Sequence, residues 1–150
     1  MTREEQRHAV ITAAIVQQQQ VADIAQKEMD SAQQQCNEYG ANVDRYDAYR
    51  TKLMRQRDMY AKQLSNALAA LRVLDELDKQ PPHQFATHGA IVIASRGRFF
   101  LSIGAGKFVA DGIPYFAISA QTPAYMAIKD KSVGDTFTIN GMAQTIIDIL

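Results

Sequence analysis

Hydrophobic residues recur at alternating steps of three and four through the first half of the chain, which is the spacing of a helix that packs along one face. The first stripe consists of His8, Ile11, Ile15, Gln18, Ala22, Ala25, Met29, Ala32 and Cys36. The second consists of Arg50, Leu53, Arg57, Tyr60, Leu64, Ala67, Leu71 and Leu74. When the ascending first stripe is paired with the descending second, the partner numbers sum to 85 or 86. This constancy predicts an antiparallel helical hairpin.

The ends of the two helices are also marked in the sequence. Thr2-Arg3-Glu4-Glu5 has the form of a capping box, and Gly40 is placed to end the first helix. Each helix is expected to have about 37 residues, or roughly 55 Å at 1.5 Å per residue. The glutamine runs at 17–20 and 33–35 are interpreted as solvated helix faces, because the apolar stripe passes through them in phase.

The pattern changes at Gln80-Pro81-Pro82. One glycine and no proline precede this point, whereas seven glycines, four prolines and all six phenylalanines follow it. Thr122-Pro123 predicts the start of a short helix running through Lys131, closed off by Gly134, and Asn140-Gly141 predicts a hairpin turn. Short apolar runs predict strands over 89–95, 98–103, 108–111, 113–119, 135–139 and 142–149. Ile118, Ala127 and Val133 are expected in the core.

These patterns predict an α+β protein with an N-terminal antiparallel coiled-coil hairpin and a small β-sheet domain carrying one short helix. Residues 1–80 are assigned to the hairpin with its tip near 40–46, 81–88 to a linker, and 89–150 to the sheet domain. Residues 81–150 are expected to fold on their own.

Composition narrows the class of function. Sixteen Lys and Arg balance sixteen Asp and Glu, so no strong overall field draws the chain to nucleic acid or to an anionic membrane. A single cysteine, Cys36, excludes an internal disulfide, the run 9–16 is too short to span a bilayer, and no secretory leader is evident. We therefore expect a cytoplasmic protein. Its three histidines lack ligand spacing, and no known catalytic or phosphate-binding motif occurs, so intrinsic catalysis is not expected.

A family resemblance rests on residues 116–135, FAISAQTPAYMAIKDKSVGD. This segment resembles the C-terminal signature of the Gre transcript-cleavage factors of bacterial RNA polymerase: a strand ending in Ser119, a helix start at Thr122-Pro123, an apolar helix, a lysine, and Gly134-Asp135 opening a strand. The order of the parts is also similar, since those factors place a coiled coil before an FKBP-like domain. The resemblance implies that the β domain docks at the polymerase secondary channel while the hairpin tip reaches the catalytic centre, with indirect contact to nascent RNA. It implies no membrane partner and no sequence-specific DNA binding.

The resemblance further implies that acidic residues at the tip help to hold a second Mg²⁺, shared with the polymerase, so that the polymerase itself hydrolyses RNA. Alignment on Gly40 places Ala41 at the first acidic position of the family, Asp44 at the second and Asp47 at the third. Glu38 is a further acidic candidate. Because one of the family's carboxylates is missing, two functions stay open. The chain could stimulate RNA cleavage, or it could occupy the channel without stimulating cleavage. Asp44 and Asp47 have a plain alternative role as a helix cap and a first-turn carboxylate.

Two other functions stay open. One is an FKBP-like peptidyl-prolyl isomerase or chaperone with a coiled-coil handle, in which Phe99, Phe100, Phe108, Tyr115 and Phe116 line a proline pocket. The other is a coiled-coil scaffold whose β domain binds a different protein. Binding to core RNA polymerase would distinguish the Gre-type function from both of these alternatives.

Overall fold

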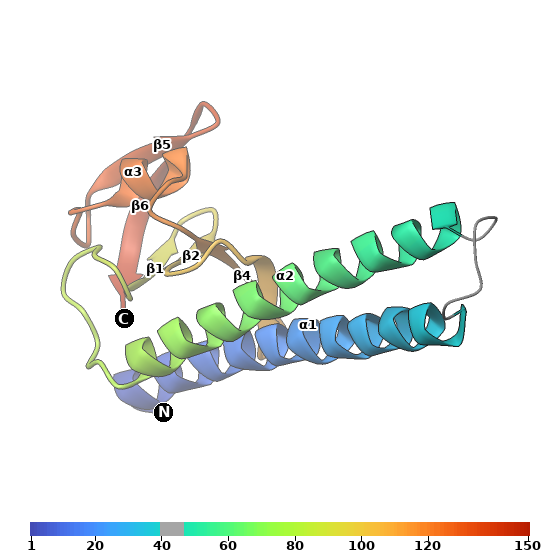
Figure 1. The fold of residues 1–150 in the computed structure, drawn as a ribbon. Coiled ribbons are helices and arrows are strands. Elements are labelled where there is room, and N and C mark those ends of the chain that lie inside the picture. The colour runs from blue at the N-terminus through green and yellow to red at the C-terminus, as the bar shows by residue number, and fades with distance from the viewer. Residues whose placement is uncertain (40–46) are drawn as a thin grey trace. The chain divides into compact units, whose positions relative to one another are not determined.

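The computed structural model describes residues 1–39 and 47–150 and confirms the α+β class (Figure 1). Two long helices come first, followed by a six-stranded mixed sheet with one short helix. The elements are α1 (Arg3–Tyr39), α2 (Asp47–Asp78), β1 (Ile91–Ala94), β2 (Arg98–Leu101), β3 (Gly106–Ala110), β4 (Ile113–Ile118), α3 (Pro123–Ile128), β5 (Thr136–Ile139) and β6 (Met142–Ile149).

The predicted capping box starts α1. The Glu5 amide donates to the Thr2 hydroxyl at 3.1 Å, and the Thr2 amide donates to the Glu5 carboxylate at 3.3 Å. Each bond satisfies a donor that the first helical turn leaves without an intrahelical partner. The helix that follows has 37 residues, as expected.

The two predicted stripes lie mostly on the buried faces of α1 and α2, although His8 and Arg50 are exposed. Polar side-chain contacts between the described parts of the helices include His8 Nδ1, which lies 2.8 Å from Asp78 Oδ1, and Arg57, which donates to the Gln33 amide oxygen at 2.8 Å. Both contacts fit an antiparallel hairpin: the numbers of the first pair sum to 86, as predicted, and those of the second sum to 90, so the long Arg57 side chain reaches beyond its predicted partner. The buried stripe residues include Ile11, Ala22, Ala25, Ala32, Cys36, Leu53, Ala67 and Leu74.

The glutamine runs of α1 are solvated only in part: Gln19, Gln20 and Gln34 are exposed as predicted, whereas Gln18 is buried. Side-chain amides donate to the residue four positions on, and three of these bonds recur every seven residues. They run from Gln19 to Asp23, from Gln26 to Asp30 and from Gln33 to Asn37, at 2.9–3.0 Å. Pairs of this kind stabilise a helix by about 0.2–0.5 kcal/mol each.

The chain forms two compact units. One contains residues 1–17 together with 72–150, and the other contains residues 18–71. The base of both long helices thus belongs with the sheet.

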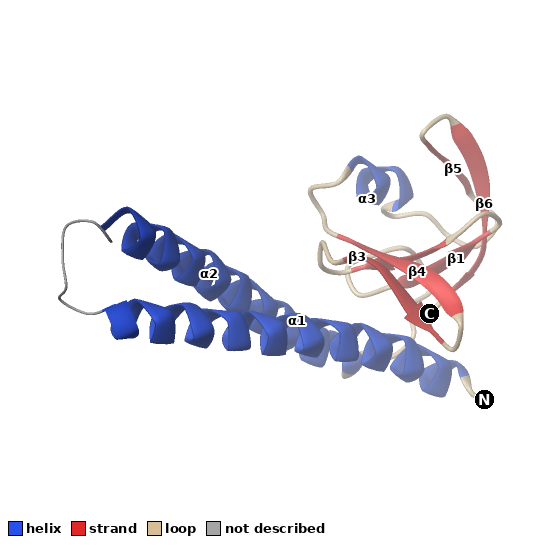
Figure 2. Ribbon diagram, turned by 90° about the vertical axis from the view of Figure 1, so that its right-hand side faces the viewer, coloured by secondary structure: helices blue, strands red, loops and turns tan. Residues whose placement is uncertain are grey.

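The strand order in the sheet is β3-β4-β2-β1-β6-β5. Figure 2 shows the strands in red and labels all of them except β2. Strands β2 and β4 are parallel, with Phe99 opposite Phe116, and all other pairs are antiparallel. The predicted Asn140-Gly141 turn has φ of 52° and 77°, values typical of the tight turn that joins two twisted strands. Asp111-Gly112 turns β3 into β4 in the same way.

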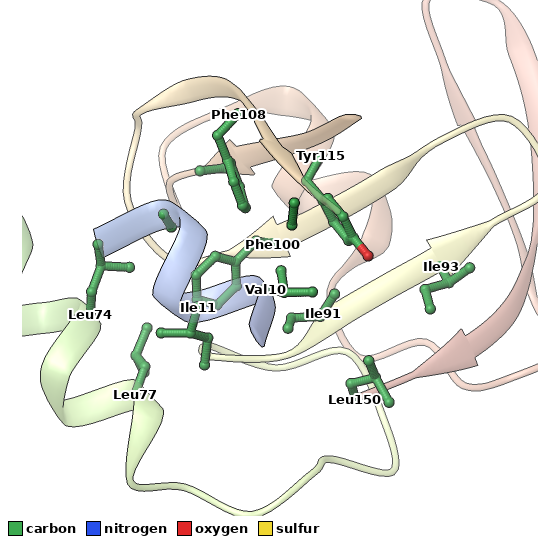
Figure 3. Packing of buried hydrophobic residues seen from close by; sticks show 13 residues of the cluster. Val10, Ile11, Leu74, Leu77, Ile91, Ile93, Phe100, Phe108, Tyr115 and Leu150 are labelled. Atoms are coloured by element: carbon green, nitrogen blue, oxygen red, sulfur yellow. The ribbon is translucent and has the colours of Figure 1, made fainter. Parts of the chain in front are cut away.

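Each face of the sheet covers a separate core, because successive side chains of a strand point to opposite faces. Figure 3 shows the core that the helices cover, where Val10 and Ile11 of α1 and Leu77 of α2 lie against Ile91 and Phe100. The opposite face packs against α3, and its buried members include Val92, Phe99, Leu101, Tyr125, Ile128, Phe137 and Ile146.

Two predictions for the segment that follows residue 123 are wrong. The helix ends at Ile128, not Lys131, because Asp130 adopts a φ of 65° and its amide bonds the carbonyl of Ala86 at 2.7 Å. The Ala86 amide returns a bond to the Lys131 carbonyl at 2.7 Å, so pairing with the segment before β1 replaces the last turn. Val133, expected in the core, is 55% exposed.

Across residues 1–39 and 47–150, no helix is both long enough and apolar enough to cross a bilayer.

Candidate functional site

The signature segment begins at the end of β4, beside its parallel neighbour β2. The Ser119 carbonyl accepts hydrogen bonds from the Thr122 amide at 3.1 Å and from the Thr122 hydroxyl at 2.8 Å. That hydroxyl also accepts from the Tyr125 amide at 3.2 Å, with extended backbone at Thr122, which is the geometry of an N-cap. Pro123 occupies the first turn of α3. Both predicted start residues are therefore confirmed as helix-start residues.

Helix α3 has an inner and an outer side. Tyr125 and Ile128 are buried in the core beneath it, and Met126 on the outer side is 64% exposed. Burial, assisted by the charge of Asp130, raises the pKa of the Tyr125 phenol. Because its side chain is buried in this cluster, Tyr125 is a core residue here.

The end of the segment is a turn that leads into β5. Gly134 has a φ of 91°, and its amide donates to the Ile146 carbonyl at 2.9 Å. The Asp135 carboxylate accepts from the Ser132 amide at 2.8 Å, and the Asp135 amide donates to the Ser132 carbonyl at 3.0 Å. Ser119, Thr122, Gly134 and Asp135 are thus all engaged in local hydrogen bonding. Exposed side chains lie between them, among them Gln121, Pro123 and Met126.

The acidic tip candidates are only partly described. Asp44 and Ala41 lie outside the described residues, Asp47 begins α2, and Glu38 is exposed next to the end of α1. Within 1–39 and 47–150, no three His, Cys, Asp or Glu side chains are grouped to hold a metal ion. The Mg²⁺ role of Asp44, Asp47 and Glu38 stays a prediction.

Helix α2 carries a cationic stripe that was not predicted from the sequence. It consists of Lys52, Arg55 and Lys62. The spacings of three and seven place these exposed residues on one side of the helix. None of the three forms an ion pair with another described residue. Between positions 48 and 62, Asp58 is the one acidic residue against five basic ones. The net charge of residues 1–80 does not reveal this stripe, because residues 18–39 of α1 contain more acidic than basic side chains.

The five aromatics considered for a prolyl isomerase pocket do not share a site. Phe100, Phe108 and Tyr115 belong to the core under the long helices, whereas Phe99 belongs to the core under α3. Phe116 lies beside Phe99, with ring centroids 6.1 Å apart, and is 41% exposed. Their division between opposite faces of the sheet removes the basis for a pocket lined by all five.

A polar cavity of about 310 Å³ lies at the base of the hairpin. Glu4, Arg7, His8, Asp78 and Lys79 are among the residues that line it. These side chains carry charges of both signs, and His8 is already paired with Asp78. The lining does not select one class of ligand.

Comparison of the chain with protein-family models, curated proteins and solved structures gave no match.

Proposed function

We propose that this chain is a Gre-type regulator of transcription elongation that binds bacterial RNA polymerase in the cytoplasm. One observation carries the proposal: two long antiparallel helices precede a mixed sheet in which residues 116–135 fold as a strand, a Thr-Pro-capped helix and a Gly-Asp turn into a further strand. In this proposal the sheet domain is FKBP-like and docks at the rim of the secondary channel.

The division of α3 into two sides supports the docking role. Residues of the signature that build the turns are held by hydrogen bonds, while Gln121, Pro123 and Met126 are exposed. A methionine that is 64% exposed adapts readily to an apolar partner surface. The proposed polymerase contact is therefore this outer side of the segment.

In this proposal the hairpin supplies carboxylates to the catalytic centre of the polymerase and has no catalytic activity of its own. Carboxylates are suitable ligands for Mg²⁺, and Asp44 and Asp47, with Glu38 near them in the sequence, are the candidates to share the ion with the polymerase. Mg²⁺ held in this way would activate water against the RNA phosphodiester. Without a carboxylate at Ala41, the alternative within the same proposal is a regulator that occupies the channel without stimulating cleavage.

The cationic stripe supports a role near nucleic acid. Lys52, Arg55 and Lys62 are exposed and are not paired with described carboxylates, so their charges are available to RNA phosphates. Replacing all three by glutamine should weaken binding to a polymerase elongation complex and flatten its salt dependence. Lys27→Gln, which removes an exposed cation from α1, is the matched control and should change neither.

Docking is tested by capture of core RNA polymerase on immobilised protein. Wild type should retain the polymerase, and Met126→Asp should lose at least about tenfold in affinity, equivalent to roughly 1.4 kcal/mol. Ile147→Asp alters a residue of similar exposure, 58%, on β6 and should bind like wild type. If wild type captures no polymerase, the proposed function is wrong.

Cleavage is tested in a backtracked polymerase complex. Release of the RNA 3′ fragment should be stimulated by wild type and abolished by Asp44→Asn or Asp47→Asn, because asparagine keeps the size but lacks the charge that binds Mg²⁺. A wild type that binds polymerase and leaves cleavage unchanged would assign the channel-occupying role and make Ala41 the decisive residue.

A further inference from the structure

Arg7 is an unusual residue in this structure because its charged side chain is only 2% exposed. The guanidinium group donates to four main-chain carbonyls: Leu77 at 2.7 Å, Gly89 at 2.5 Å, and Gln80 and Leu150 at 3.2 Å. These carbonyls belong to the end of α2, the segments on either side of the linker, and the residue after β6. A single side chain of α1 therefore bonds the end of α2, both ends of the linker and the residue that follows β6.

The charge of Arg7 suits this place. Burial lowers its pKa, and the nearby Asp78 carboxylate opposes that change, but a guanidinium stays charged in proteins. Helix α2 has no basic residue in its own last turn, and its final carbonyls form the negative end of the helix dipole. The Leu77 carbonyl is one of these groups, and it accepts from Arg7 as well as from the Gln80 amide at 3.1 Å just beyond the end of α2. Arg7 thus supplies from α1 the C-terminal cation that α2 lacks.

We propose that Arg7 is the positioning residue that fixes the base of both long helices, residues 1–17 and 72–78, to the sheet domain, so that a partner bound to the sheet domain also holds the base of the hairpin. The inference rests on the proposed function, since it assigns docking to the sheet and action to the hairpin tip. The planar fork of arginine matters because its donors reach carbonyls in several directions at once. Lysine carries the same charge at a single nitrogen and cannot span these four groups.

Arg3 provides a matched control on the same helix. It also bonds β6, through the Asp148 carboxylate at 2.9 Å and the Ile149 carbonyl, but its side chain is 54% exposed. Exposed ion pairs contribute little, typically about 0–1 kcal/mol. Arg3→Ala removes contacts between α1 and β6 while leaving the buried junction at Arg7 intact.

The first experiment needs no polymerase. Spin labels at Thr12→Cys on α1 and Thr138→Cys on β5, in a Cys36→Ser background, report the distance between the helix base and the sheet by pulsed electron resonance. Both labelled positions are exposed. Wild type and Arg3→Ala should give the same narrow distribution, and Arg7→Met should give one at least about twice as wide, as the base samples more arrangements. If Arg7→Met does not fold, Arg7→Lys is expected to broaden the distribution in the same sense.

The second experiment separates binding from action. With core polymerase, Arg7→Lys should bind within about threefold of wild type yet show at least about tenfold less effect on the backtracked complex at saturating protein. Simple loss of stability would instead lower apparent affinity and leave the saturated effect unchanged. Arg3→Ala should match wild type in both measurements.

The two proposals fail in different ways. Wild type that binds no polymerase would reject the proposed function, and the label distances would still decide the role of Arg7. Folded Arg7→Met and Arg7→Lys proteins with the wild-type distance distribution would overturn the inference, as would an unchanged saturated effect.

Discussion

Gly89 adopts a left-handed backbone, with φ of 95°, close to the end of α2. A Cβ added at this residue would lie 2.9 Å from Leu77 Cδ2 and 2.6 Å from Gln80 Oε1. Its carbonyl accepts from Arg7 and its amide donates to the Leu101 carbonyl at 2.6 Å, so the backbone is held on both sides. The position therefore lacks both the conformational freedom and the space for a side chain.

We predict that Gly89→Ala lowers the free energy of unfolding by about 2–4 kcal/mol, through backbone strain combined with overpacking against Leu77. Gly112→Ala is the matched control. Gly112 also has a positive φ, 76°, but a Cβ there would meet nothing within 4 Å, so strain alone should cost about 1 kcal/mol. Chemical denaturation of the two variants gives the comparison, and equal losses would contradict the steric argument.

We predict that His83 makes the free energy of unfolding depend on pH. Burial lowers the pKa of its imidazole, and the charges of Arg7 and His88 lower it further, so the folded chain favours the neutral ring. The unfolded chain binds the proton at the ordinary pKa of 6.5, above the folded value. Stability from His83 is therefore complete above pH 6.5 and is lost as pH falls through the folded pKa. Denaturation of His83→Gln should show a shallower loss of stability below pH 6.5 than wild type, and parallel curves would remove His83 as the cause.

The role of a residue could be predicted where its bonding partners are near in the sequence, and not where they are distant. The capping box at Thr2 and the N-cap at Thr122 were predictable because each bonds an amide three residues on. The role of Arg7 was not, since its partner carbonyls lie 70 to 143 positions away. Val133 was misjudged because an apolar residue beside a turn gives no local sign of which way it faces.

Elements were predictable where a periodic pattern sets them. The strand at Met142–Ile149 has the bounds expected from the sequence, and the α1 stripe is buried or partly buried at every position except His8. The order of the strands was not predictable, because the parallel pairing of β2 with β4 joins segments across an intervening hairpin strand. The candidate site could also be predicted only in part. The helix start at 122–123 follows from its motif. The tip carboxylate Asp44 lies outside the described residues.

The register of the hairpin gives a prediction at the scale of the two helices. Ala22 is buried on α1 and Leu64 is partly buried on α2, and the summed numbering pairs them. With Cys36→Ser, a protein carrying Ala22→Cys and Leu64→Cys should oxidise to an intramolecular disulfide, since such a bond needs Cα atoms about 4.4–6.8 Å apart. Ala22→Cys with Leu68→Cys is the offset control, because Leu68 is 42% exposed. Non-reducing electrophoresis separates the products, and purely intermolecular dimers would reject the antiparallel register.

At the scale of the whole molecule, the sheet domain and the base of the hairpin share one core. Val10, Ile11, Leu74 and Leu77 are each at most 3% exposed and belong to the cluster that contains Phe100 of β2. The sequence boundary at 80–82 is still visible, since α2 ends at Asp78 and β1 begins at Ile91. Packing nevertheless crosses that boundary, and this changes the expectation for an isolated sheet domain.

We predict that residues 81–150 alone do not form a stable fold. Removing the helices uncovers the face of the sheet that carries Ile91 and Phe100, both 0% exposed. Burial of one large apolar side chain is worth about 1.5–3 kcal/mol, so losing the four helical ones costs on the order of 10 kcal/mol, similar to the whole stability of a domain. The loss of the Arg7 bonds to Gly89 and Leu150 adds to this.

A chain that keeps residues 1–17 and 72–150, joined by a short helix-to-helix loop, retains that packing and should fold. Because this variant lacks only residues 18–71, its sheet and helix base keep all thirteen buried members of the shared cluster. Thermal unfolding followed by circular dichroism should show one cooperative transition for this variant and none for residues 81–150. Cooperative unfolding of residues 81–150 within a few degrees of that variant would show that the sheet holds its fold through the core under α3 alone.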